Sequence, residues 1–423
     1  MRKIERLLLQ VVMAFFVLPI FAQNGVNSPY SRYGVGLLSD QGVGINKAMG
    51  NFGIGLRERN TLNTLNPASY STVDTLTFLF DAGFSLSNLH IKENGVRTNA
   101  RNASFDYVAM QFRIVRNLGC TISYLPFSNV GYSFSQSELL REDIDGEITA
   151  TNSYAGEGGL RQFAFGLGWA PFKFLSFGAD FAYLSGQITH VVSNKYSDAS
   201  ILSRNKTYYA EMRGFKSNIG MQATAKLRDG KLTLGLLYSP KVNFRGDGLM
   251  YDEMLDGTTS EVSDTLSTFK DFSVPFRMGA GISYSREKWL VGFDVNYEAW
   301  SNAIFMGEGG IDGRDRIKMS LGGRFQLDKT HHNLFHRSSY MAGCFMSQPY
   351  YNIGSDKGPT EYGVSLGISL PVINAWNNMI EFNVVGQYVH VSPTDIKYIE
   401  ENYFRLCLGI AFNERWFTKW KVN

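Results

Sequence analysis

Apolar and polar residues alternate along most of the chain from residue 75 onward. In the segment 289–299, one face carries Trp, Val, Phe, Val, Tyr and Ala, while the other carries Leu, Gly, Asp, Asn and Glu. The segments 317–327 and 404–413 repeat this pattern. A period of two residues predicts β-strands, and each of these strands has one apolar face and one face that is mostly polar or small.

The alternation predicts fourteen strands, many of them longer than ten residues. Strands of this length are typical of sheets that cross a membrane. Aromatic residues near the strand ends are expected to form interface girdles, namely Trp169, Trp289, Trp300, Tyr340, Trp376 and Trp416. The predicted strands are 75–91, 102–115, 117–137, 159–171, 175–192, 209–227, 230–245, 269–286, 288–300, 314–327, 338–350, 360–371, 377–391 and 402–413.

Tight turns alternate with long loops between these strands. A soluble sandwich shows the same alternation of side chains, but short turns on one side and long loops on the other are typical of outer-membrane barrels. We therefore expect an all-β fold, a closed antiparallel transmembrane barrel over residues 75–413 with its polar face inward. The tight turns are expected at 172–174, 228–229 and Glu287, and the long loops at 138–158, 193–208 and 246–268.

The first residues have the features of a secretory signal. Three basic residues lie among the first six, a mostly apolar run follows over 7–20, and Ala22 stands at a plausible cleavage point. This run is too short to span a bilayer. We expect residues 1–22 to be removed on export, and Gln23 in place of a cysteine argues against a lipid anchor. The expected location is the outer membrane of a Gram-negative-type cell.

Charge and cysteine usage narrow the function classes. A formal net charge of +3 over 423 residues argues against a nucleic-acid partner. Cys120, Cys344 and Cys407 lie in three separate alternating runs. An odd number of distant cysteines without CxxC spacing predicts neither a disulfide framework nor a metal site. No cofactor is expected.

The segment 64–71, TLNPASYS, precedes the first predicted strand. An Asn-Pro step favours a turn, and the residue before a proline is pushed away from helical backbone angles. Pro67 is therefore expected to separate the residues before it from the sheet. Ser69 and Ser71 are expected to hydrogen-bond the freed backbone.

Four stretches occur in an order that resembles the FadL-type outer-membrane transporters of hydrophobic compounds. They are Ala48–Gly55 followed by Asn66-Pro67-Ala68, then Gly235–Pro240, Val274–Gly279 and Trp289–Ser301. The resemblance implies a fourteen-stranded barrel whose lumen is plugged by a hatch formed by residues 23–74. It implies hatch positions at Gly50, Gly53, Gly55, Asn66, Pro67 and Ala68, and barrel-motif positions at Tyr238, Pro240, Pro275, Gly279, Asp294, Tyr297 and Trp300.

The third predicted strand carries a break. Pro126 has no N–H for the ladder, and Gly131 weakens the strand or permits a bulge close to Asn129. The physical expectation is a wall break near 126–131. The resemblance implies that such a kink lets a ligand leave sideways into the membrane, whereas the alternative is a bulge that only adjusts barrel curvature.

No catalytic or metal-binding set is predicted. His331, His332 and His336 fall in one turn, but their spacing does not make the rings converge, so a solvated periplasmic turn is expected. The acidic loop 246–268 lacks calcium-loop spacing. His90, His190 and His390 have no serine motif around them, and we do not expect an enzyme.

Two functions remain open from the sequence. The first is uptake of small hydrophobic molecules, which bind in the plugged lumen and leave at the kinked third strand. The second is a structural barrel subunit of a multi-protein outer-membrane secretion or assembly complex. Three features favour the second: the charged run Arg57-Glu58-Arg59, the segment 24–36, and a basic aromatic tail over 414–423. The expected partners are outer-membrane lipids, a hydrophobic ligand or other envelope proteins.

Overall fold

The computed structural model describes most of the chain beyond the predicted signal peptide. The signal peptide 1–22 and nearly all of the predicted tail 414–423 lie outside the described residues. Within the described part, no helix combines the length and apolarity needed to cross a membrane. The described ranges are 25–75, 77–93, 95–143, 146–198, 200–256, 259–304, 313–328, 331, 333–373, 379–393 and 399–415.

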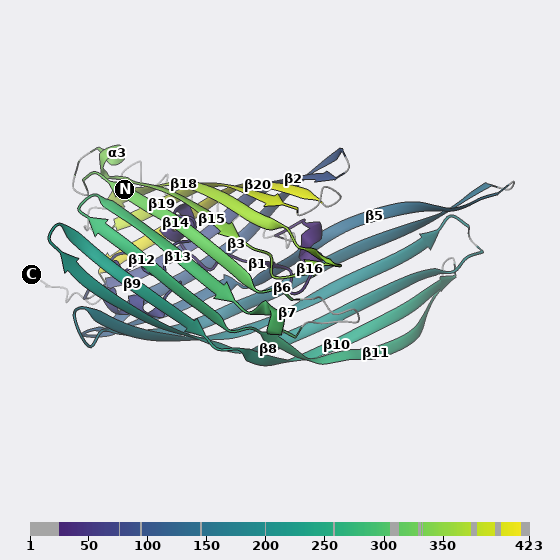
Figure 1. Cartoon of the computed structure of the whole chain (residues 1–423), viewed down its shortest axis with the longest axis horizontal. Coiled ribbons are helices and arrows are strands. Elements are labelled where there is room, and N and C mark those ends of the chain that lie inside the picture. The colour runs from purple at the N-terminus through teal and green to yellow at the C-terminus, as the bar shows by residue number, and fades with distance from the viewer. Residues whose placement is uncertain are drawn as a thin grey trace, which may run out of the picture.

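The strands form a closed antiparallel barrel (Figure 1). The last strand, β20, pairs with the first barrel strand, β2, which closes the sheet. Three of the fourteen barrel strands are each interrupted into two pieces, which are β4 with β5, β9 with β10, and β11 with β12. The fourteen-stranded barrel is thus confirmed. Its strands are β2 (Thr77–Glu93), β3 (Val96–Val115), β4 (Leu118–Pro126), β5 (Ser128–Asp143), β6 (Gly146–Trp169), β7 (Leu175–Tyr196), β8 (Ser203–Leu227), β9 (Gly230–Ser239), β10 (Val242–Asp256), β11 (Thr259–Val274), β12 (Arg277–Arg286), β13 (Trp289–Glu298), β14 (Arg316–Gln326), β15 (Ser339–Ser347), β18 (Thr360–Ile373), β19 (Met379–Ser392) and β20 (Glu400–Arg415).

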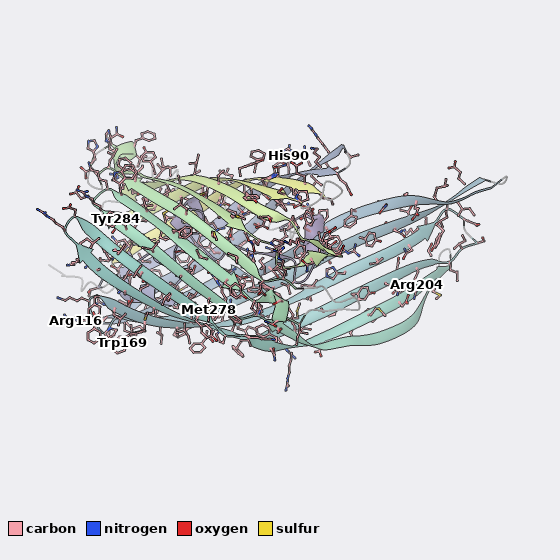
Figure 2. The ribbon with its side chains drawn as sticks, in the orientation of Figure 1. His90, Arg116, Trp169, Arg204, Met278 and Tyr284 are labelled. Carbon is pink, nitrogen blue, oxygen red and sulfur yellow. The ribbon has the colours of Figure 1, made fainter. Side chains whose placement is uncertain are left out.

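The apolar face of each strand points outward, as the alternation predicts. On β13, Trp289 and Val291 are exposed on the outer face, whereas Leu290 and Asp294 are buried on the inner face. Figure 2 shows Trp169, Met278 and Tyr284 on the outside of the barrel. Trp300 departs from the expected girdle, because it is 1% exposed and packs at 4.8 Å from the ring of Tyr350. Trp376 and Trp416 lie outside the described residues.

Residues 25–75 precede the barrel strands and occupy the lumen (Figure 1). They contain only short elements, since glycine and proline interrupt them repeatedly. Met49, Phe52, Ile54 and Leu56 among them are fully buried. The elements are η1 (Pro29–Arg32), β1 (Leu37–Leu38), α2 (Ile45–Ala48) and η2 (Pro67–Thr72), and the barrel loops add η3 (Trp300–Asn302), α3 (Leu334–Arg337), β16 (Asn352–Ile353) and β17 (Asp356–Lys357).

The wall of the barrel has two very different heights. Strands β6, β7 and β8 have 24, 22 and 25 residues, whereas β13, β14 and β15 have 10, 11 and 9. About 9–11 residues suffice to cross a membrane as a tilted strand. The short strands therefore match the membrane alone, and β5, β6, β7, β8, β10 and β11 continue well beyond it (Figure 1). We call this extension the tall wall.

The tall wall corrects the expectation of long loops. Residues 138–143 and 146–158 continue β5 and β6, with Tyr132 paired to Gly156 and Glu138 to Ala150. Residues 193–196 and 203–208 likewise extend β7 and β8, and 246–256 and 259–268 belong to β10 and β11. These segments are polar on both faces, so they lack the alternation by which the membrane strands are recognised. Neighbouring strands nevertheless pair their backbone groups with one another.

Candidate functional site

Ten barrel strands each place at least one glycine against the N-terminal segment in the lumen. A Cβ atom built on any of these residues would lie 1.9–2.6 Å from an atom of residues 48–70, which is closer than real contacts allow. At seven of these positions the plug atom that the Cβ would meet belongs to the backbone, so the plug backbone lies directly on the wall there, whereas at Gly220, Gly292 and Gly367 it is a side-chain atom of Asn66, Phe52 and Ala48. These residues, which we call the glycine belt, are Gly119, Gly168, Gly178, Gly220, Gly235, Gly281, Gly292, Gly322, Gly343 and Gly367.

Of the predicted hatch glycines, Gly50 and Gly55 lie on the other side of this contact, whereas Gly53 is enclosed by residues of the plug itself. Gly50 has φ +66°, and a Cβ there would meet the backbone of Cys344 at 2.7 Å. At Gly55 a Cβ would meet the backbone of Gly281 and Ile282 at 2.9 Å, while Gly53 is confined by the side chain of Leu65 at 2.5 Å. Small residues are thus required on both surfaces, because the plug and wall approach too closely for side chains.

Asp294 joins the plug to the wall by hydrogen bonds. Its carboxylate accepts from the backbone N–H groups of Gly53 and Ile54, both at 2.7 Å, and from that of Gly55 at 3.4 Å. Asp294 is 1% exposed. A buried carboxylate that receives three N–H donors is a strong, directional anchor. The sequence singles out this residue, and the structure assigns it a contact with the hatch.

The other motif residues on and near β13 do not converge on Asp294. The Tyr297 hydroxyl donates to Asp315 at 2.5 Å, and Trp300 Nε1 donates to Glu298 at 2.7 Å. Both contacts lie at the far end of β13, close to the loop that follows it. They therefore stabilise the rim of the barrel at the short strands β13 and β14.

Asn66, Pro67 and Ala68 form the start of η2. The Asn66 side chain accepts from Ala68 N–H at 3.0 Å and donates to the carbonyl of Ile54 at 2.9 Å. Ser69 and Ser71 donate to the carbonyls of Asn66 and Ala68, at 2.7 and 2.9 Å. A Cβ on Gly178 would lie 2.3 Å from Pro67. The segment is a buried turn pressed against the glycine belt.

Tyr238, Pro240, Pro275 and Gly279 lie where the barrel meets the tall wall. Pro240 separates β9 from β10, and Pro275 separates β11 from β12. Below these prolines β9 pairs with β12, whereas above them β10 pairs with β11. A proline has no N–H for the ladder and suits such a change of partner. Tyr238 faces outward, and Gly279 faces Ile54 of the plug.

The third strand is broken where the sequence predicts a wall break. Strand β4 ends at Pro126 and pairs with β3, while β5 starts at Ser128 and pairs with β6. Strand β1 pairs with β5 at two positions, Leu37 to Asn129 and Leu38 to Ser128. Among the described residues, no ladder joins β5 to β3. A gap in the wall ladder therefore opens above Pro126.

The N-terminal segment covers this gap. Asn129 Nδ2 donates to Ser39 Oγ at 2.8 Å, and the Gly131 N–H donates to Ser31 Oγ at 3.0 Å. The Asn27 amide donates to Asn102 of β3 at 2.7 Å. The segment thus contacts both sides of the gap. A role for Pro126, Asn129 and Gly131 as a lateral exit stays a prediction.

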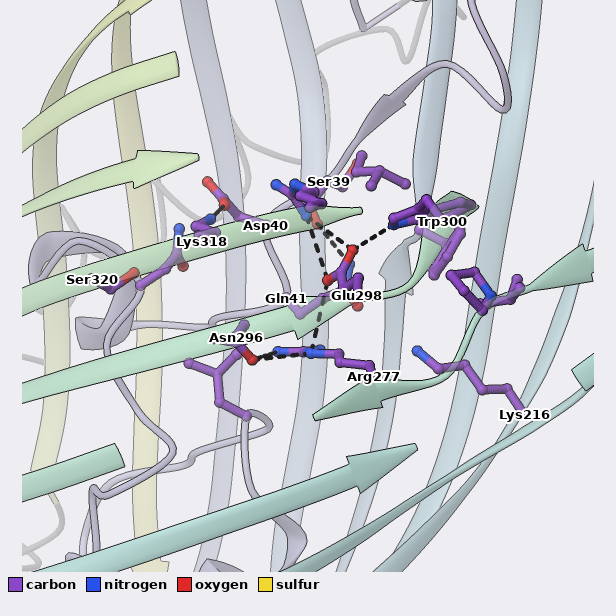
Figure 3. Close-up of a pocket in the computed structure, with 17 residues that line it drawn as sticks. Ser39, Asp40, Gln41, Lys216, Arg277, Asn296, Glu298, Trp300, Lys318 and Ser320 are labelled. Atoms are coloured by element: carbon purple, nitrogen blue, oxygen red, sulfur yellow. Dashed lines mark hydrogen bonds and ion pairs between the residues drawn. The ribbon is translucent and has the colours of Figure 1, made fainter. Parts of the chain in front are cut away.

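Among the cavities that the described residues leave around the plug, two are lined by several charged groups. The first has about 70 Å³ and is bordered by Asp40, Lys216, Arg277, Glu298 and Lys318 (Figure 3). The second has about 130 Å³, and its lining includes Asp106 and Arg405. Sequence reasoning placed polar side chains in the lumen without predicting this cluster.

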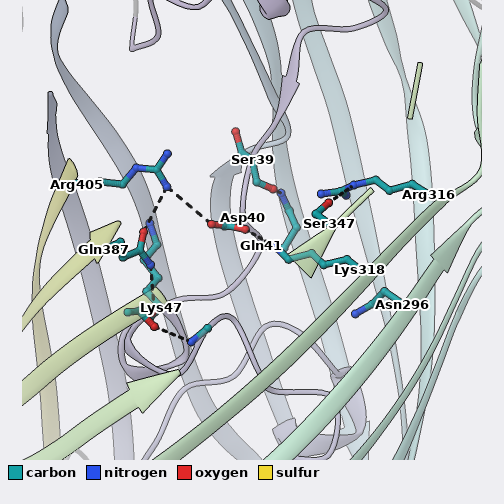
Figure 4. A network of polar contacts seen from close by, with 12 residues as sticks. Ser39, Asp40, Gln41, Lys47, Asn296, Arg316, Lys318, Ser347, Gln387 and Arg405 are labelled. Atoms are coloured by element: carbon teal, nitrogen blue, oxygen red, sulfur yellow. Dashed lines mark hydrogen bonds and ion pairs between the residues drawn. The ribbon is translucent and has the colours of Figure 1, made fainter. Parts of the chain in front are cut away.

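Asp40 links the plug to two wall strands (Figure 4). It accepts from Lys318 Nζ at 2.6 Å, and Arg405 lies 3.9 Å away. Burial alone would raise the Asp40 pKa, but the Lys318 and Arg405 charges more than offset this and hold the pKa below its ordinary value. Lys47 forms a further buried pair with Asp106 at 2.6 Å.

The charged run of the plug also contacts the wall. Arg57 donates to Ser176 Oγ and to the Ala68 carbonyl, at 2.5 and 2.9 Å, and burial lowers the pKa of Arg57 to about 10. Glu58 accepts two hydrogen bonds from Arg324, at 2.6 and 2.5 Å. Arg59 is exposed and lies 3.6 Å from Asp74. The run is therefore an attachment of the plug.

The histidine turn and the isolated histidines do not assemble into a site within the described residues. The His331 and His336 rings lie 4.6 Å apart, and His331 Nδ1 accepts from the Asn333 N–H. His332 lies outside the described residues. Across the described residues, no group of three or more His, Cys, Asp or Glu side chains is arranged to hold a metal ion.

Comparison with known proteins assigns the chain to a family. A family model described as BamG matches residues 2–423. The chain belongs to the BamG family. No curated protein sequence matches this member of the BamG family.

Solved structures show which fold this BamG-family chain has. CymD, a monoaromatic hydrocarbon channel, matches with a TM-score of 0.59 and 12% identity over 89% of this chain and 99% of that one. The toluene transporter TodX of Pseudomonas putida matches with a TM-score of 0.55 and 12% identity, over 91% of this chain and 100% of that one. A FadL homologue of Pseudomonas aeruginosa matches with a TM-score of 0.54 and 12% identity, over 90% of this chain and 98% of that one. The resemblance to FadL-type barrels is confirmed at the level of the fold.

Proposed function

We propose that this chain is a plugged outer-membrane barrel that serves as a structural subunit of a multi-protein envelope complex and docks its partner through the tall wall. The observation that carries the proposal is that the tall wall is an open sheet. In the described residues, β11 pairs with β10 alone, and β5 pairs with β6 and with only two residues of β1. Both edges therefore present unpaired backbone groups.

Open edges are unusual in a barrel protein. Closure of a barrel removes edges, and natural proteins otherwise cover or shorten them because an exposed edge pairs readily with another chain. An edge strand is also a common docking element, to which a partner adds a strand through main-chain hydrogen bonds. With short turns facing the periplasm, as in bacterial barrels, the tall wall stands outside the cell.

The lumen supports a structural role. The glycine belt leaves no layer of side chains between plug and wall that rearranges easily, and Asp294, Arg57 and Glu58 attach the plug at separate places. The cavities are small and charged. A purely apolar molecule would leave these buried charges without water or partners, which is costly.

Purification from the native membrane in mild detergent tests the proposal. The full chain is expected to bring down other envelope proteins in fixed stoichiometry. A variant in which residues 134–154 are replaced by a two-residue Asn-Gly turn shortens β5 and β6, and it should fold but lose the partners. Removal of the β16–β17 hairpin, which lies outside the tall wall, is the control. Isolation of the full chain as a lone barrel would contradict the proposal.

A second candidate function is uptake of small hydrophobic molecules with lateral exit at the third strand. The gap between β3 and β5, covered by the two-residue β1, favours it. The similar structures are described as a toluene transporter and a monoaromatic hydrocarbon channel. On this reading, residues 31–39 move aside to open the gap.

A reversible lock separates the two functions. Ser39 and Asn129 contact each other through their side chains at 2.8 Å, so the pair Ser39→Cys and Asn129→Cys places two thiols across the gap. If the chain is a channel, oxidation should stop uptake of labelled toluene into cells, and a reductant should restore it. If it is a docking subunit, the lock should leave co-purification unchanged. Each single cysteine variant serves as the control.

A further inference from the structure

Lys216 is a buried lysine that forms no ion pair or hydrogen bond with the described part of the chain. It lies on β8, and only 7% of its surface is exposed. Its ammonium group lies 5.3 Å from the centre of the Phe127 ring, a cation–π contact. Figure 3 shows the side chain at the edge of the 70 Å³ cavity, without a dashed contact. A buried charge without a partner is strongly unfavourable, so a missing counter-charge is expected.

The other cations around this cavity already share the available carboxylates. Arg277 and Arg316 both approach Glu298, at 3.8 and 3.3 Å, and Lys318 pairs with Asp40 at 2.6 Å. The lining residues therefore comprise four cations and two carboxylates. The cavity is left with an excess of positive charge.

Asp180 does not neutralise Lys216 directly. It lines a smaller neighbouring cavity together with Lys216 and Arg277. Its carboxylate accepts from Asn218 Nδ2 at 2.6 Å. Asp180 lowers the electrostatic cost of the nearby cations but forms no ion pair with Lys216 among the described residues.

Asn51 is a second buried group on the same cavity that finds no partner in the described part of the chain. It is 7% exposed, and neither its Nδ2 nor its Oδ1 has a hydrogen-bond partner there. It holds φ +62°, a left-handed conformation that is uncommon outside glycine. Two unsatisfied buried polar groups on one cavity indicate that something polar completes it.

We propose that this cavity binds a small oxyanion, with Lys216 as its charge partner and the Asn51 amide as a donor. The volume of about 70 Å³ is several times the roughly 10–15 Å³ that one water requires, so a compact ion fits. Asn51 belongs to the plug, Lys216 lies on β8 just below the tall wall, and Glu298 ends the short strand β13, so the site lies where these three regions meet. A bound oxyanion joins them electrostatically.

Thermal unfolding of the purified full chain in detergent tests the site, with inorganic phosphate, sulfate and acetate each titrated against chloride at constant pH and ionic strength. Saturable stabilisation is expected for at least one oxyanion, since a ligand that binds the folded state raises the unfolding temperature. Lys216→Gln should weaken the apparent affinity at least about tenfold. Lys226→Gln, an exposed lysine on the same strand, should leave the titration unchanged.

Two outcomes would overturn the proposal. One is a wild-type titration that never saturates for any of the three oxyanions, which remains decisive even if the Lys216 variant does not fold. The other is an unchanged titration for Lys216→Gln. Asn51→Gly, which removes the amide while tolerating the positive φ, should also weaken binding. The oxyanion that saturates at the lowest concentration identifies the preferred chemistry.

Discussion

The plugged part of the barrel and the tall wall are built from the same kind of strand but are stabilised differently. In the lower barrel, each strand has one face toward lipid and one face toward the plug, and glycines bring the plug backbone directly onto the wall. In the tall wall both faces are largely polar, and its contacts include ion pairs such as that of Asp252 with Arg204, whose side chain is 46% exposed. The comparison teaches that the plug belongs to the rigid body, while the adaptable surface lies outside the membrane.

The largest effect is expected from a side chain in the glycine belt. Gly178→Val would put a Cβ 2.3 Å from the carbonyl carbon of Pro67, and neither backbone yields easily. We expect a loss of about 3 kcal/mol in the free energy of unfolding, or expulsion of the plug with an open pore in planar bilayers. Gly386→Val is the matched control, because a Cβ there meets nothing within 4 Å. Equal behaviour of the two variants would contradict a fixed plug.

Removal of the Asp294 carboxylate should have the next largest effect. Asp294→Ala leaves the N–H groups of Gly53, Ile54 and Gly55 buried without their acceptor. A cost of about 2–3 kcal/mol in the free energy of unfolding is expected. Urea unfolding followed by tryptophan fluorescence measures it. Asp294→Asn, which keeps one acceptor oxygen, should lie between wild type and the alanine variant.

A third prediction compares one arginine from each region. Arg324→Met removes two short hydrogen bonds from Glu58 in a pair whose side chains are 15% and 21% exposed. This substitution should lower the free energy of unfolding by about 2 kcal/mol. The Arg204 side chain is 46% exposed, and Arg204→Met should lower the free energy of unfolding by less than about 1 kcal/mol. A larger effect at Arg204 would reverse the comparison between plug and tall wall.

The smallest effect concerns acid sensitivity. The Asp40 pKa lies below its ordinary value, so the unfolded chain takes up a proton at this residue before the folded chain does. The contribution of Asp40 to stability is therefore present above about pH 4 and is lost as the pH falls toward the folded-state pKa. The difference in unfolding free energy between wild type and Asp40→Asn should be about 1 kcal/mol at pH 6 and shrink at pH 3. A difference that grows on acidification would refute this assignment.

Much of the membrane barrel was predictable from the sequence, because lipid on one side and a filled lumen on the other impose a two-residue period. The tall wall was predicted as loops for the opposite reason. Its strands are polar on both faces, as in 138–158, so their sequence lacks the two-residue alternation of apolar and polar side chains that predicts a strand. Asn66 and Pro67 predicted a turn from local chemistry alone.

The partners of that turn are far away in the sequence, and no local signal indicates them. Asn66 contacts Ile54 in the plug and approaches Gly220 in the wall, which only the closed barrel brings together. The polar alternation of 317–327 did place Lys318 in the lumen. Its pairing with Asp40, and the lack of an ion-pair partner for Lys216 among the described residues, depend on the packing of three separate regions.

Amide hydrogen exchange tests the central claim, a plug that is part of the rigid barrel, most directly. The N–H groups of Gly53 and Ile54 are bonded to buried Asp294, so they should exchange as slowly as the amides of β13. The edge strand β5 above Gly131 should exchange much faster. Protection of Gly53 and Ile54 that is lost while β13 stays protected would show a plug that opens on its own, and it would contradict the account.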